Sequence, residues 1–88
     1  MLLIGRIFAD SGDITVAWTG GPYIDIYMGA DEDVPTETIN VWDYEKERPF
    51  VKRRAKDMCQ FVVRWLQRER DITDIQGFGY RTVDPEVD

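Results

Sequence analysis

The chain has 88 residues, of which 43% are hydrophobic and 12% aromatic, and its formal net charge at pH 7 is −6. This length accommodates one hydrophobic core, and the hydrophobic fraction argues against disorder. The absence of histidine and the single cysteine exclude the commonest general base and an internal disulfide. No apolar run approaches the roughly 20 residues that span a bilayer, and the apolar start is too short for a signal peptide. We therefore expect a soluble, cytoplasmic protein with no membrane partner.

The first third of the chain predicts an antiparallel meander of three strands. Residues 2–8 and 14–18 are rich in strand-forming side chains, and each is followed by a glycine-containing turn, at 10–13 and at 19–22. Residues 23–28 alternate strictly, so their side chains divide between two faces of a strand. One face carries Ile24, Ile26 and Met28, and the other carries Tyr23, Asp25 and Tyr27.

An acidic loop and a fourth strand follow. The loop contains Asp31, Glu32 and Asp33. Clustered carboxylates suit hard cations such as Ca²⁺, but the spacing lacks the ligand order of an EF-hand loop, so an acidic surface loop is the better interpretation. Residues 37–43 predict a strand with Ile39 and Val41 on its buried face and Trp42 on the other.

The period then changes to that of a helix. Apolar residues recur on one stripe at Val51, Ala55, Met58, Val62, Trp65 and Leu66, with Cys59 at its edge. This spacing predicts an amphipathic helix from about residue 48 to 70, with Pro49 in its first turn. Residues 72–81 predict a short last strand, interrupted by two glycines. The acidic residues 84–88 form a polar tail.

These elements predict an α+β fold in the order β-β-β-β-α-β. A four- to five-stranded antiparallel sheet carries one long amphipathic helix on one face. Residues 1–83 form a single domain, followed by the acidic tail at 84–88. The helix leaves the opposite sheet face open to solvent or to a partner.

Charge is distributed unevenly along the chain. Residues 45–70 contain nine basic and four acidic residues, a net +5, whereas the rest contains two basic residues, Arg6 and Arg81, and thirteen acidic ones, a net −11. The pattern indicates a basic helix joined to an acidic sheet and acidic loops. A solvated helix face explains it most simply, and a bipolar interaction surface is the alternative.

No motif in the chain indicates catalysis, a metal ion or a cofactor. Residues 20–22 join two predicted strands, so they indicate a turn and not a phosphate cradle. Residues 77–80 place aromatics between glycines, as RNA-binding strands do, but lack the flanking residues of that signature and favour a bent edge strand. Cys59 is a core residue by its position on the helix. Asp25 lies between two tyrosines on a polar strand face, where catalysis is not expected. We therefore expect a protein that is not an enzyme.

The predicted contact region for a partner protein lies on the open side of the sheet. Tyrosine and tryptophan are enriched in protein interfaces, because a rigid ring buries a large area at a low entropic cost. Trp18 and Trp42 end their predicted strands, and an exposed tryptophan there would anchor a partner. The residues predicted to bind the partner are Tyr23, Asp25, Tyr27, Asp31, Glu32, Asp33 and Trp42.

The segment Ile39-Asn40-Val41-Trp42-Asp43-Tyr44, followed by a basic amphipathic helix, resembles small proteins encoded by bacteriophages of actinobacteria. The resemblance covers residues 37–66. It implies an accessory protein that binds a host protein, in the host cytoplasm, and it implies no catalytic residues.

We therefore expect a non-enzymatic protein-interaction module, and two alternatives to it stay open. The first is a homodimeric structural protein, in which the open face or a sheet edge pairs with a second copy. The second is nucleic-acid binding through Arg53, Lys56 and Arg64 on the helix, which the negative net charge opposes because phosphate binding depends on basic charge.

Overall fold

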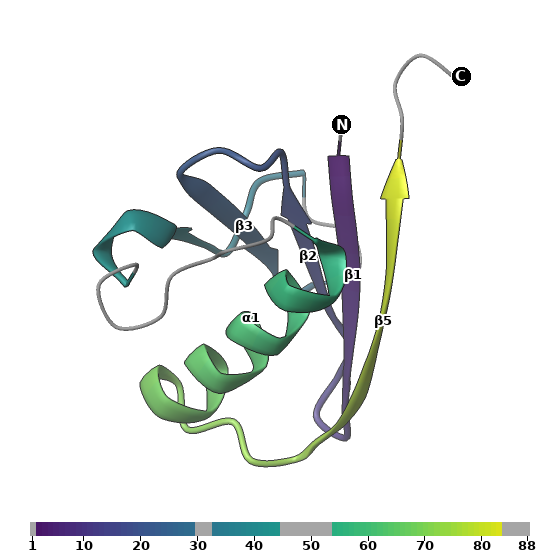
Figure 1. Cartoon of the computed structure of the whole chain (residues 1–88). Helices are drawn as coiled ribbons and strands as arrows, with labels where there is room; N and C mark the ends of the chain where they lie inside the picture. Colours follow the sequence, from purple (N-terminus) through teal and green to yellow (C-terminus); the bar gives the residue numbers. More distant parts are fainter. Residues whose placement is uncertain (1, 30–32, 45–53, 84–88) are drawn as a thin grey trace.

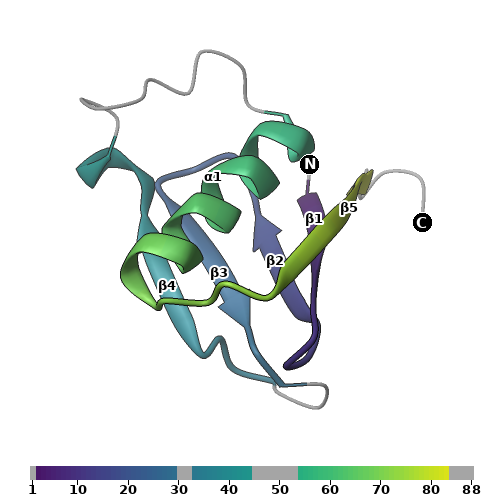
Figure 2. The same cartoon turned by 90° about the horizontal axis from the view of Figure 1, so that it is seen from below.

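The computed structural model describes residues 2–29, 33–44 and 54–83. Its elements are β1 (Leu2–Ala9), β2 (Ile14–Trp18), β3 (Tyr23–Tyr27), β4 (Glu37–Asn40), the 3-10 turn η1 (Val41–Asp43), α1 (Ala55–Glu69) and β5 (Ile75–Val83). The strands form one antiparallel sheet in the order β4-β3-β2-β1-β5, and α1 lies across one face of it (Figure 1; Figure 2). The predicted α+β fold and its order of elements are confirmed.

Tight turns containing glycine connect the strands of the meander. Gly12 between β1 and β2 has a φ of 138°, and Gly20 between β2 and β3 has a φ of 85°, values that L-residues with a Cβ adopt at a cost. The Trp18 indole N–H donates to the Gly21 carbonyl oxygen at 2.8 Å. The turn at 20–22 thus joins two strands, as predicted, and opens no helix.

The hydrophobic core lies between α1 and the sheet. Alternate residues of β1, β2 and β3 point toward α1, while the predicted apolar stripe of α1 faces the sheet. The buried side chains on the sheet side are Leu3, Ile7, Ile14, Val16, Trp18, Ile24, Ile26, Ile39 and Val41, and those on α1 are Ala55, Met58, Cys59, Val62, Trp65 and Leu66. The alternation predicted for residues 23–27 and the helical stripe over these residues are confirmed. Met28, predicted on the same strand face as Ile24 and Ile26, follows β3 and is half-buried against the core.

Gly5 allows α1 to approach the sheet closely. It lies on the α1 side of β1, between Leu3 and Ile7 and opposite Val16 and Tyr80 on the neighbouring strands. A Cβ at this position would overlap the Sγ atom of Cys59. A glycine opposite a small thiol therefore determines how near the helix lies to β1.

The helix begins later than the sequence predicts. Arg54 has an extended backbone, with φ −114° and ψ 151°, so the first helical residue is Ala55. The Arg54 guanidinium donates to Asp57 Oδ2 at 2.8 Å. Asp57 lies in the first turn of α1, so its carboxylate is near the positive end of the helix dipole. Pro49 and Val51, which the prediction placed in the helix, lie outside the described residues.

The bounds of β4 and β5 also differ from the prediction, and β1 and β3 each end one residue away from their predicted ends. β4 ends at Asn40 and not at 43, because the Asn40 side chain accepts a hydrogen bond from the Trp42 backbone N–H at 3.1 Å and starts the turn η1. β5 occupies Ile75–Val83 and not 72–81. Before it, Asp71 adopts a positive φ of 55°, and the Ile72 N–H donates back to the Leu66 carbonyl at 3.2 Å. The residues between α1 and β5 therefore form the turn that reverses the direction of the chain.

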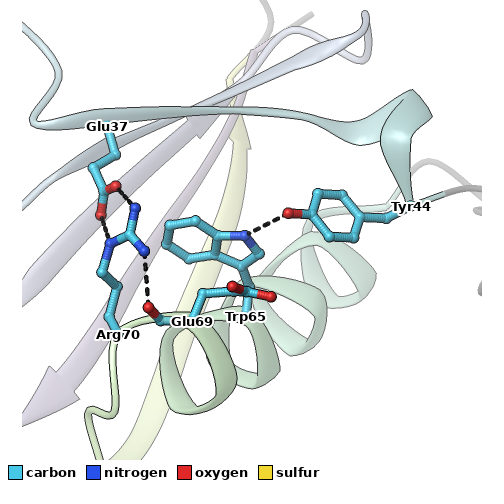
Figure 3. Close-up of polar contacts among 5 residues, drawn as sticks. All are labelled: Glu37, Tyr44, Trp65, Glu69 and Arg70. Carbon is cyan, nitrogen blue, oxygen red and sulfur yellow. Dashed lines mark hydrogen bonds and ion pairs between the residues drawn. The ribbon is translucent and has the colours of Figure 1, made fainter.

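The end of α1 is connected to β4 and η1 by a group of aromatic and charged side chains (Figure 3). The Trp65 indole N–H donates to the Tyr44 hydroxyl at 3.2 Å. The Arg70 guanidinium lies 4.6 Å from the Trp65 ring centroid and binds both carboxylate oxygens of Glu37. The hydrogen bond with Glu37 raises the pKa of Arg70. These contacts join the edge strand β4 to the helix.

Within the ranges 2–29, 33–44 and 54–83, no helix has both the length and the apolar character that crossing a membrane requires.

Candidate protein-binding face

The sheet face opposite α1, here called the open face, carries the candidate site. Register places the same-facing side chains in rows across the strands. Its members are Ile4, Arg6 and Phe8 on β1, Thr15 and Ala17 on β2, Tyr23, Asp25 and Tyr27 on β3, Thr38 and Asn40 on β4, and Gly77, Gly79, Arg81 and Val83 on β5. Among the described residues, no helix covers this face (Figure 2).

The three predicted residues of β3 share the open face. Tyr23, with 56% of its surface exposed, lies opposite Asn40 on β4. Asp25 is half-buried and accepts a hydrogen bond from the Thr38 hydroxyl at 3.0 Å. Tyr27 is half-buried and lies opposite Thr15 on β2. The three side chains therefore share the open face, and Tyr23 is the most exposed of them.

The other described residues of the predicted contact region, Asp33 and Trp42, lie beyond the two ends of β3. Trp42 is 59% exposed and comes two residues after Asn40, so it lies near the Tyr23 end. Asp33 is exposed in the connection that follows the Tyr27 end. Asp31 and Glu32 are outside the described residues. The predicted group thus contains three neighbours on one strand and separate flanking residues.

Trp18 is not available to a partner. It is 1% exposed and belongs to the core, because position 18 faces α1 and its N–H is bonded to Gly21 within the turn. Of the two tryptophans that end predicted strands, only Trp42 is exposed.

The open face also contains residues that the sequence analysis did not assign to a site. Phe8 is 42% exposed on β1. Arg6 lies opposite Gly79, and Arg81 lies opposite Ile4, so the two arginines are diagonal neighbours on adjacent strands. Any extended strand over residues 2–8 places Ile4, Arg6 and Phe8 on one face, but only the pairing of β1 with β5 adds Arg81.

The sheet is less acidic than predicted. Asp25 and Glu37 are the carboxylates on the five strands, and Glu37 lies on the α1 side, paired with Arg70. The remaining described acidic residues outside α1 lie in turns and connections, so the open face carries one carboxylate and two guanidiniums. α1 itself has three basic and two acidic side chains. It therefore carries little of the net charge of +5 that residues 45–70 have together.

A hollow lies between the two arginines. Its volume is about 280 Å³, and its lining includes Arg6, Arg81, Thr15 and Gly79. Gly79 contributes no side chain to this hollow, and the Phe8 ring lies beside it, with Cε2 3.9 Å from where a Cβ of Gly79 would be. In the part of the chain that the structure describes, no carboxylate lies within ion-pair distance of either guanidinium.

The aromatic residues of the 77–80 segment do not belong to the open face. Phe78 and Tyr80 pair with Ile7 and Gly5, which places both rings on the α1 side with their centroids 6.1 Å apart. The segment is an edge strand, as predicted. Bases stacked on the open face would meet Gly77 and Gly79 and not these two rings.

Cys59 is enclosed between α1 and the sheet. Its side chain is fully buried, and its thiol lies 3.9 Å from the Gly79 carbonyl oxygen. Burial raises the pKa of Cys59 to about 11, because a thiolate would lose its hydration in the core. The thiol is therefore protonated at neutral pH. Within the described ranges, no group of three or more Cys, Asp or Glu residues is placed to hold a metal ion.

Burial predicts that native Cys59 reacts slowly with thiol reagents. At pH 8, modification by an aromatic disulfide should be at least about a hundredfold slower in the native protein than in urea, because the core must open first. Absorbance of the released thiolate measures both rates. Equal rates in the two conditions would contradict the enclosed position.

Comparison of the chain with protein-family models, with curated proteins and with solved structures gave no match.

Proposed function

We propose that this protein is a non-enzymatic interaction module that binds a partner protein through the open face. The supporting observation is the exposure of Tyr23, at 56%, with Tyr27 half-buried on the same face of β3 and Phe8, 42% exposed, near the other end of the face on β1. A single exposed ring is ordinary on a protein surface, but several on one uncovered sheet face match the composition of binding surfaces.

The contact region is centred on β3. Tyr23 and Tyr27 flank Asp25 on one strand, and the Thr38 hydroxyl holds the Asp25 carboxylate in place. Two rigid rings around an oriented acceptor offer both apolar area and a directional hydrogen bond. Trp42 is also exposed and comes two residues after Asn40, which lies opposite Tyr23.

The partner that we propose is a protein of a bacterial host, and the chain is then a phage accessory protein in the host cytoplasm. This part of the proposal rests on the resemblance of residues 37–66. The charge of the open face, one carboxylate and two guanidiniums, supports a contact in which aromatic area contributes more than net charge.

The test is an affinity capture from bacterial lysate, with and without nuclease, followed by mass spectrometry and a measured affinity for the captured protein. The double variant Tyr23→Ala/Tyr27→Ala should weaken binding by at least about thirtyfold, since interface tyrosines contribute about 2 kcal/mol or more. The control Gln60→Ala/Gln67→Ala removes exposed side chains from α1 and should bind like the original chain. Far-UV circular dichroism should be unchanged in both.

Three results would contradict the proposal. Unchanged affinity of the double tyrosine variant would exclude the open face as the contact. Recovery that disappears with nuclease would indicate that the captured protein was held through nucleic acid bound by the basic residues of the helix, the second alternative above. Recovery of the bait alone, combined with a dimer in sedimentation, would indicate the self-associating structural protein.

A further inference from the structure

The two edges of the sheet differ in how they are protected from pairing with another strand. β4 has four residues, follows Pro35 closely, and carries Glu37 bound to Arg70. β5 has nine residues, without proline or lysine. Edge strands are normally protected by shortness, proline or lysine, because their unpaired N–H and C=O groups bind other strands. β4 combines shortness with a nearby proline, whereas β5 is long and is protected only by a bulge at Gln76, near its start, and by the charge of Arg81.

The outer side of β5 is free within the described part of the chain. β5 is the last strand in the sheet order and pairs with β1 on its inner side (Figure 1). An added strand would lie about 4.8 Å farther out and continue the sheet. This geometry provides backbone hydrogen bonds for any extended segment, so the side chains beside the edge determine which segment is preferred.

Those side chains are basic on the open face. Arg81 lies on β5 itself, and Arg6 lies on β1 opposite Gly79. Because Gly79 has no side chain, no Cβ lies between Arg6 and an added residue opposite Gly79. The Cα atoms of Arg6 and of that added residue would be about 10 Å apart, which is two strand spacings. A glutamate and an arginine together span this distance, and Arg81 flanks the same space. A carboxylate there would meet two guanidiniums that have no acidic partner among the described residues.

We propose that β5 is a docking strand that pairs with an extended acidic segment of a partner protein, with one carboxylate of that segment bound between Arg6 and Arg81. A second copy of the chain suits this edge less well, because β5 paired with itself around Gly79 would bring four arginines together without a carboxylate on either strand. The docking strand uses residues other than the tyrosines of β3 and is independent of them.

A displayed library of random nine-residue peptides, selected on the whole protein, tests this docking mode. Selected peptides should share an Asp or Glu at one position of the extended segment, and fluorescence anisotropy then gives their affinities. Arg81→Glu should weaken binding by about tenfold or more, because it replaces attraction with repulsion. A peptide with Lys in place of the acidic residue should bind Arg81→Glu better than it binds the original chain. Arg64→Glu makes the same charge change on the exposed side of α1 and should leave affinity unchanged.

Two further probes separate strand pairing from simple charge attraction. Gly79→Val fills the empty position, and its Cβ meets nothing nearer than Phe8 Cε2 at 3.9 Å, so the fold should be retained while peptide binding is lost. Peptides N-methylated at alternate residues lose every second donor. Methylation of the N–H groups that face β5 should abolish binding, whereas methylation of the N–H groups that point away from β5 should preserve it.

Any of four results would overturn the proposal. The selected peptides could lack acidic residues, or Arg81→Glu could leave their affinity unchanged. The two sets of N-methylated peptides could bind equally well, or the protein could form a dimer that Gly79→Val dissociates. The variant Tyr23→Ala/Tyr27→Ala should bind the selected peptides normally. Failure of the tyrosine contact and failure of the docking strand are therefore distinguishable.

Discussion

Replacement of Gly5 with alanine should destabilise the protein by about 1–3 kcal/mol, the usual cost of inserting an extra methyl group into a packed core. The methyl would overlap the Cys59 Sγ atom and lie near the Met58 side chain. Urea denaturation followed by tryptophan fluorescence gives the free energy of unfolding. Gly79→Ala is the matched control on the opposite sheet face, where a Cβ has ordinary contacts, and it should keep or slightly raise stability.

The cause of the Gly5 effect can be isolated with a second substitution. Cys59→Ala removes the sulfur atom that the new methyl would meet. In that background Gly5→Ala should be close to neutral, and the double-mutant cycle should give a favourable coupling of about 1 kcal/mol or more. If Gly5→Ala costs the same in both backgrounds, or no more than Gly79→Ala, then the close approach of α1 to β1 is not the cause.

Replacement of Trp65 with alanine should destabilise the protein by about 3–5 kcal/mol, as is typical of large buried aromatics. Trp65 is 6% exposed and contacts Tyr44 and Arg70, which connect α1 to η1 and to Glu37 (Figure 3). Loss of the ring leaves a cavity and removes the support for this end of the helix. Thermal and urea unfolding measure the change.

The hydrogen bond within this group contributes less than the packing. Tyr44→Phe removes the hydroxyl that accepts the Trp65 N–H and keeps the ring, so it should cost only about 1 kcal/mol. A loss below about 1 kcal/mol for Trp65→Ala, or an equal loss for both variants, would contradict the central role of the buried indole.

Local sequence signals were sufficient for most of the secondary structure. Alternation over residues 23–28 and the helical stripe from Ala55 to Leu66 correspond to buried faces in the structure. The predicted ends of β4 and α1 were wrong where a single side chain or backbone angle overrides the local secondary-structure propensity. Asn40 ends β4 by binding the Trp42 N–H, and the extended backbone of Arg54 delays the helix.

Alternation along the chain is enough to show which residues of β3 share the open face, because a period of two is a property of any extended strand. Helical spacing likewise places Cys59 at the edge of the core stripe. The remaining features depend on how the elements pack against one another. Arg6 and Arg81 are far apart in sequence and become diagonal neighbours only because β1 pairs with β5 in one register. The fit of Gly5 against Cys59 likewise depends on where α1 crosses β1, and such contacts between distant segments have no local signal in the chain.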